Sequence, residues 1–182
     1  SAFFLYGIAF VYGSTGSTNL SEIVTAFDST IPVDRSEALL LAGIALLLVG
    51  LGFKVAAVPF HVWTPDVYEG APTPVTALMA SVGKAAAFAA MLRVLVAGFG
   101  HYRDDWRPVV WVLAVASLII GPVLAIVQTD VKRMLAYSSI NHAGFMLVGL
   151  EAAARNAGEA DLSSPAPSAS PELILQSWKA AR

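Results

Sequence analysis

The sequence of 182 residues contains no cysteine. A chain without thiols forms no disulfide bond and supplies no thiolate, so disulfides, iron–sulfur clusters and thiolate metal sites within this chain are excluded. Charged residues are also scarce: Asp, Glu, Lys and Arg make up 13% of the chain, and the formal net charge is −2. No basic stripe is present that would hold phosphates, so we expect no nucleic-acid partner.

The sequence also lacks the short motifs of common soluble enzymes. It has no glycine-rich phosphate loop, no G-x-S-x-G nucleophile elbow and no dinucleotide-binding fingerprint. It shows no signal peptide of the usual form, because Ser1 opens directly into the apolar run SAFFLYGIAFVYG. We therefore expect a fragment of a longer chain, without a soluble catalytic module.

Hydrophobic residues dominate the chain instead. They make up 57% of it, whereas ordinary globular domains are about 45–50% apolar and about 25% charged. About 20 residues at a rise of about 1.5 Å cross a hydrocarbon core of about 30 Å. The three central apolar runs are each long enough, and the first is too short to span alone. The apolar runs are residues 2–12, 38–60, 75–99, 108–127 and 134–154.

These runs predict an all-α fold, namely a polytopic transmembrane helix bundle. Residues 1–153 would form about five membrane segments, separated by polar, turn-rich loops such as TPDVYEGAPTP and GHYRDDWRP. Residues 154–182 are rich in Pro, Ser and Ala, which predicts a polar, flexible C-terminal tail. Several aromatic residues lie near the ends of runs, where amphipathic rings favour the headgroup level: Trp63, Tyr68, Tyr102, Trp106 and Trp111.

Lys84 lies deep inside the run at 75–99, too far from either end for its side chain to reach the interface. A charge at the centre of a membrane helix costs about 2.5–3.5 kcal/mol on insertion scales, unless it faces a bundle interior or a wet cavity. The small residues around it, ASVGKAAA, favour an interior face. Lys84 is therefore a candidate site in a proton or ion path, and a structural ion pair is the alternative.

Lys54 lies five residues before Pro59, in FKVAAVPFHVW. A proline at this position removes one backbone hydrogen bond and clashes with the carbonyl of Val55, so we predict a discontinuous, proline-broken helix. Transporters commonly place their sites at such breaks. Lys54 is the second candidate in the proton path. The alternative is an ordinary helix end from which the lysine reaches the surface.

Histidine titrates near neutrality and can relay protons. His142, in SSINHAGFMLVGL, is a candidate relay, and His61 after the break is a weaker one; a structural role in hydrogen bonding is the alternative for both. No second His, Asp or Glu stands at metal-ligand spacing, so we expect no metal site. The remaining charges near run ends are interpreted as solvated loop acids or headgroup anchors: Asp66, Glu69, Asp130, Lys132 and Arg133.

Two long segments, FKVAAVPFHVWTPDVYEGAPTPVTALMASVGKAAAFAAMLR and QTDVKRMLAYSSINHAGFMLVGL, carry a family resemblance. They resemble the proton-translocating, antiporter-like membrane subunits of respiratory complex I, the NADH–quinone oxidoreductase, and the similarity covers about residues 1–150. The segment HVWTPDVYEGAPTPV favours the N branch of this family over the sister branches L and M. The wider family includes subunits of multisubunit Na⁺/H⁺ antiporters, which gives an alternative function.

The resemblance implies roles for individual residues. Lys54 would lie in the discontinuous helix and Lys84 at the centre of the next one, and protons would pass between them through water. His142 matches a family histidine and would act as a relay. The family's glutamate on an earlier helix and its later discontinuous helix are not found in this sequence.

The resemblance also implies partners and a location. The partners would be the other membrane subunits of complex I and the lipid bilayer, in the inner (plasma) membrane of a bacterium. NAD, FMN, iron–sulfur clusters and quinone would bind in partner subunits. This chain would hold no cofactor and no redox active site of its own.

Overall fold

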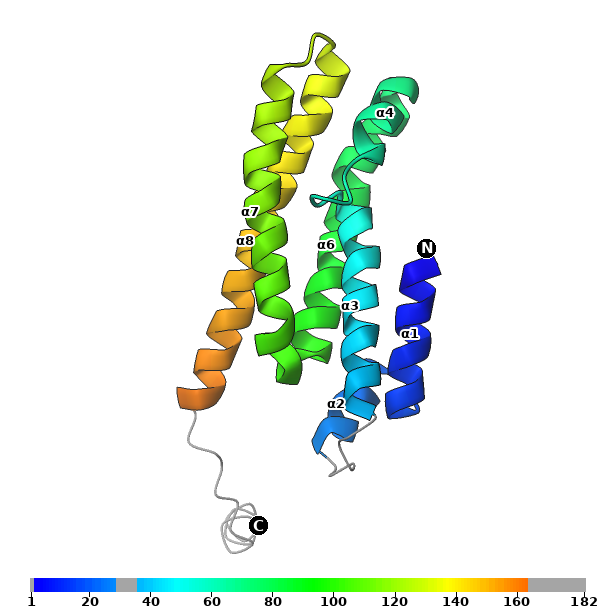
Figure 1. Ribbon diagram of the computed structural model, residues 1–182, viewed down its shortest axis with the longest axis vertical. Helices are drawn as coiled ribbons and strands as arrows, with labels where there is room; N and C mark the ends of the chain where they lie inside the picture. The colour runs from blue at the N-terminus through cyan, green and yellow to red at the C-terminus, as the bar shows by residue number, and fades with distance from the viewer. Residues whose placement is uncertain (1, 29–35, 164–182) are drawn as a thin grey trace, which may run out of the picture.

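The structure is a computed structural model that describes residues 2–28 and 36–163. The longer helices run roughly along one common axis (Figure 1). The elements are α1 (Ala2–Thr15), α2 (Leu20–Asp28), α3 (Ser36–Val55), α4 (Trp63–Gly70), α5 (Thr73–Leu78), η1 (Met79–Gly83), α6 (Lys84–Met91), η2 (Leu92–Gly98), η3 (Gly100–Tyr102), α7 (Arg103–Ile126) and α8 (Val131–Ser163). The predicted all-α class is confirmed.

Three helices are long and apolar enough to cross a membrane: Glu37–Val55, Thr73–Gly98 and Gly100–Ile126. They correspond to the three central runs of the sequence, so the predicted transmembrane bundle is confirmed. The second of these helices is composite, because α6 lies between the π-helical segments η1 and η2. Such π segments are rare in proteins and occur frequently at functional sites.

Close backbone contacts join the helices in pairs. α7 and α8 pack side by side as an antiparallel pair, and α1 packs against α3 (Figure 1). A Cβ atom on Gly121 of α7 would lie 3.0 Å from the backbone nitrogen of Asn141 on α8. Small residues at such crossings are the usual means by which membrane helices approach each other. The buried core between the helices includes Leu47, Met91, Leu95, Val110 and Leu147.

The structure extends helices into segments that the sequence predicts to be loops. α4 begins at Trp63 and covers the first part of TPDVYEGAPTP, with Pro65 near its start, where the missing N–H of proline has no helical acceptor to lose. α7 begins at Arg103 rather than at residue 108. α8 continues to Ser163, so the predicted tail begins as helix, in an alanine-rich stretch of high helix propensity. The rest of the tail lies outside the described residues.

Two of the aromatic side chains near the ends of the apolar runs are buried within the chain. Trp106 is 1% exposed, and its Nε1–H donates to the carbonyl of Phe99 at 2.9 Å. Tyr68 is also buried. Trp111 is 57% exposed, in contrast. Both buried rings belong to helices that the sequence does not predict at those positions, and the level of these rings in the membrane stays a prediction.

Candidate functional site

The chain leaves helical geometry between α3 and α4. Ala56, directly after α3, has a φ of 61°, and the N–H of Ala57 donates to the carbonyl of Gly52 at 2.9 Å. The N–H of Ala56 donates to the carbonyl of Phe53 at 3.2 Å, which completes a Schellman-type helix end. Pro59 lies in the non-helical segment that follows. The predicted discontinuous helix is confirmed: α3 stops at Val55, and Pro59 lies inside the break rather than at its start.

α7 supports this broken backbone. The N–H of Val58 donates to the hydroxyl oxygen of Ser117 at 2.9 Å, and the same hydroxyl donates to the carbonyl of Leu113 at 2.7 Å. The Nε1–H of Trp63 donates to the carbonyl of Phe53 at 3.1 Å. Freed backbone groups at membrane depth need such partners. Sequence reasoning misses Ser117, because a lone serine in an apolar run resembles any small residue.

Lys84 opens α6 and is only 7% exposed. Its Nζ donates to the carbonyl of Ser139 on α8 at 2.9 Å and is also hydrogen-bonded to the hydroxyl of the same serine. The hydroxyl of Tyr68 on α4 lies close to the same Ser139 side chain. Within residues 2–28 and 36–163, no ion pair involves Lys84. The described carboxylates therefore give no support to the structural-ion-pair alternative.

The other two predicted path residues lie on the surface of this chain. Lys54 is in the last turn of α3 and exposed, and His142 is exposed on α8, with its ring centroid 6.4 Å from that of Phe145. In the described part of the chain, no hydrogen bond or ion pair joins either residue to Lys84. Their roles in a proton path therefore stay predictions.

Further polar atoms lie buried beside the break. His61 Nδ1 and Thr64 Oγ1 have no hydrogen-bond partner among the described residues, and Thr64 is completely buried. The rings of His61 and Tyr137 of α8 meet edge to face, with centroids 6.4 Å apart. Buried polar atoms are normally satisfied. The interior next to the break is thus more polar than its apolar sequence suggests.

Arg133 joins α8 to α4 at one end of the bundle. Its Nη1 lies 2.6 Å from Asp66 Oδ1 and 2.7 Å from Glu69 Oε2. The hydrogen bonds that Arg133 donates to Glu69 and Asp66 raise the pKa of its guanidinium above the usual value. Asp66 and Glu69 thus lie on a helix and pair with Arg133, and do not stand alone in a loop as predicted, because the fold of the bundle brings α4 against the start of α8. The role of Arg133 as a headgroup anchor stays a prediction.

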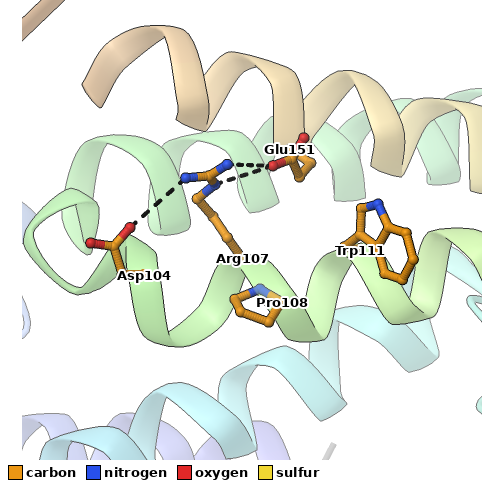
Figure 2. A pocket seen from close by; sticks show the side chains of 5 residues that line it. All are labelled: Asp104, Arg107, Pro108, Trp111 and Glu151. Atoms are coloured by element: carbon orange, nitrogen blue, oxygen red, sulfur yellow. Dashed lines mark hydrogen bonds and ion pairs between the residues drawn. The ribbon is translucent and has the colours of Figure 1, made fainter. Parts of the chain in front are cut away.

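A pocket of about 280 Å³ lies at the other end of the α7–α8 pair (Figure 2). Figure 2 shows Arg107 of α7 pointing to Glu151 of α8. The Arg107 Nη2 lies 2.6 Å from Glu151 Oε1, and its Nη1 lies 3.8 Å from Asp104 Oδ1. Because two carboxylates already share this guanidinium, we interpret the group as a clamp between the helices rather than as a ligand site.

Lys84, Ser139 and Tyr68 thus form a polar cluster inside an apolar bundle. An amine can take up and release a proton, and a hydroxyl can donate or accept a hydrogen bond as its partner requires. Across the part of the chain that the structure describes, no three His, Asp or Glu side chains gather as metal ligands would. The chemistry that this cluster offers is proton uptake and release at Nζ.

Comparison with known proteins identifies similar sequences. The family described as "NADH:quinone oxidoreductase/Mrp antiporter, TM" matches residues 1–162. NADH-quinone oxidoreductase subunit N of Parafrankia sp. is 55% identical over 150 residues, which make up 82% of this chain and 28% of that relative. This chain therefore spans less than a third of the relative's length.

Solved structures share the arrangement of helices. A chain of respiratory complex I from Thermus thermophilus with bound aureothin is 46% identical, with a TM-score of 0.65, over 84% of this chain and 31% of that chain. A chain of the Mrp complex from Dietzia sp. is 26% identical, with a TM-score of 0.71, over 82% of this chain and 27% of that chain. The fold is common to both, and the sequence identity is higher to the complex I chain.

Proposed function

The chain belongs to the NADH:quinone oxidoreductase/Mrp antiporter family of membrane proteins, and from this premise we propose that it is part of a proton-translocating subunit of NADH–quinone oxidoreductase, respiratory complex I. The 55% identity to a subunit N supports this proposal. Partner subunits would carry NAD, FMN, iron–sulfur clusters and quinone, and electron transfer would take place there. This chain, in a bacterial plasma membrane, would have no redox site and would pass protons.

The burial of Lys84 carries the proposal. Its amine lies within a membrane-spanning helix and has neutral oxygen partners on α8. A negative charge brought close would stabilise the protonated amine, and withdrawal of that charge would favour release of the proton. Charge movements that begin in partner subunits would in this way drive protons through the membrane.

Lys54 and His142 would be further stations of the same path. Both are exposed in this chain, which spans 28% of its relative's length. In the longer subunit, the remaining helices would cover these faces, and water between the helices would connect the stations. Lys54 would exchange protons with Lys84 from the broken helix, and His142 would relay them along α8.

The proposal is tested with Lys84→Ala in the complete, assembled complex. Loss of a proton-transfer group typically lowers a rate by about 10²–10⁴-fold, so we expect proton pumping and coupled quinone reduction to fall at least about tenfold. Both are measured in sealed vesicles, with a pH-sensitive dye and with NADH oxidation. Arg93→Ala is the matched control, because Arg93 is a basic residue of the same composite helix that is exposed. Normal pumping by an assembled Lys84→Ala complex would refute the proposal.

A second candidate function is that of a subunit in a multisubunit Na⁺/H⁺ antiporter. The TM-score of 0.71 to a chain of the Mrp complex favours it. Proton exchange that depends on sodium and proceeds without NADH would support this function. Proton uptake that depends on NADH oxidation would support the first.

A further inference from the structure

We propose that Ser139 is the positioning residue of Lys84 and that its hydroxyl, together with that of Tyr68, links the protonation state of Lys84 to α4, the second half of the broken helix. This inference rests on the proposed function, because it assigns further residues to the same proton path. The hydrogen bonds between Ser139 and Lys84 of α6 are the observations that carry it, and the Tyr68 hydroxyl of α4 lies close to the same serine side chain.

Ser139 holds the amine with two oxygen atoms at once. Its carbonyl accepts a hydrogen bond from Nζ at 2.9 Å, and its hydroxyl contacts the same nitrogen. Both oxygens belong to one residue of α8, so the lysine side chain is directed to a single point on that helix. Because the lysine is buried, these contacts decide where the proton sits when it is bound.

The hydroxyl can serve both protonation states of the lysine. A protonated amine has three N–H donors, whereas a neutral amine has two donors and one lone pair. The carbonyl of Ser139 can only accept, but the hydroxyl accepts from the charged amine and donates to the neutral one. A carboxylate here would strongly favour the charged form. A serine keeps its contact in both states and reverses the direction of one hydrogen bond.

This reversal extends to Tyr68. When the Ser139 hydroxyl accepts from Nζ, its own hydrogen is available to Tyr68; when it donates to Nζ, it can accept from the tyrosine hydroxyl. The geometry between α4 and α8 is held in place, because Arg133 pairs with Asp66 and Glu69. Gain or loss of one proton at Lys84 is therefore sensed in α4, next to the break.

The test compares serine variants in the complete complex. Ser139→Ala keeps the carbonyl and removes the hydroxyl, and we expect proton pumping to fall about tenfold, the effect of one lost hydrogen bond in the transition state. Ser139→Thr restores a hydroxyl and should restore at least half of the pumping. Ser138→Ala is the control, since this neighbouring serine is also half-buried and should pump normally. Failure of Ser139→Thr to restore pumping would overturn the inference.

Tyr68→Phe tests the second link and removes only a hydroxyl. If Ser139 and Tyr68 act as a unit, the double variant Ser139→Ala/Tyr68→Phe pumps no worse than the poorer single variant. Losses that multiply would show independent effects and would overturn the link. If Ser139→Ala fails to assemble, normal pumping by Tyr68→Phe alone overturns it as well.

Lys84→Ala separates the two proposals. If Lys84→Ala stops pumping while Ser139→Ala pumps normally, the inference about Ser139 is wrong and the proposed function stands. If Lys84→Ala itself pumps normally, the proposed function fails, and the inference fails with it. Reduced pumping in both variants, with recovery in Ser139→Thr, supports both.

Discussion

Single side chains allow a membrane-spanning helix to break inside the bundle. Ala56 accepts a positive φ of 61°, which an L-residue adopts less readily than glycine. Ser117 reaches across from α7 to the N–H of Val58. A buried N–H that loses its acceptor costs about 1–3 kcal/mol. The stability of the break thus depends on a residue 59 positions away in the sequence.

Ser117→Ala leaves the Val58 N–H without its acceptor and should lower the stability of the assembled subunit by about 1–3 kcal/mol. The measurement is the thermal unfolding midpoint in detergent. Ser81→Ala is a matched control, because Ser81 also donates to the carbonyl four residues earlier, at 2.6 Å, but is exposed. Equal midpoints for the two variants would contradict the role of Ser117.

Lys84 and Pro59 could be predicted from the sequence, because each breaks a local rule: a charge in an apolar run, and an imino acid where a helix would continue. Ser139 breaks no rule, since membrane helices tolerate serine, and its partner Lys84 is 55 positions away. The packing of α6 against α8 brings these two residues together. No pattern within either helix contains that information.

At the scale of helices, the α7–α8 pair is the most tightly joined unit. Gly121 brings the two backbones together in the middle, and Arg107 joins Glu151 near one end. At the other end, Arg133 of α8 joins α4. These contacts hold Ser139 in a fixed position on α8. Helix packing is in this way coupled to the position of the Lys84 amine.

Gly121→Leu tests this coupling. The added side chain would meet the backbone of Asn141, where even a Cβ atom would be only 3.0 Å away. Overpacking of this kind costs about 1–3 kcal/mol, so we expect a lower unfolding midpoint and weaker proton pumping. Gly149→Leu on α8 is the control, because a Cβ there meets no atom within 4 Å. An equal effect of both substitutions would contradict the proposed close approach.

The positions of helices could be predicted from the sequence where an apolar run is long and continuous. The prediction failed where the helix sequence is polar. The long apolar runs correspond to α3, α7 and the composite helix at Thr73–Gly98. The sequence does not predict α4, because WTPDVYEG is polar and contains a proline. It is held by contacts with α8, notably those of Arg133. Such tertiary contacts override local preference and cannot be read from a single segment.

For the whole molecule, the composition of the outer surface determines which environment, water or lipid, suits the chain. Large apolar side chains are exposed on the long helices, such as Leu5 and Tyr6 on α1 and Trp111, Ile119 and Ile126 on α7. Soluble monomers rarely expose continuous apolar surface on this scale. These side chains suit a lipid environment or contact with further helices. The composition of the sequence was sufficient to predict this property, because it does not depend on how the helices pack.

Membrane extraction checks this property directly. Expressed by itself, the chain should remain in the membrane pellet after an alkaline carbonate wash and should aggregate when detergent is removed. The measurement is the distribution between pellet and supernatant, with a peripheral membrane protein as the released control. A monodisperse, soluble chain without detergent would contradict the transmembrane assignment.

The π-helical segment η1 ends at Gly83, immediately before Lys84. A π turn contains one residue more than the same turn in α geometry, and one α-helical residue corresponds to a rotation of about 100°. If η1 became regular α-helix while α5 stayed in place, α6 would rotate about its axis by this amount. The Lys84 amine would then leave α8 and face another neighbour. The helix therefore contains within itself the extra residue that would let the Lys84 side chain turn from one neighbouring helix to another.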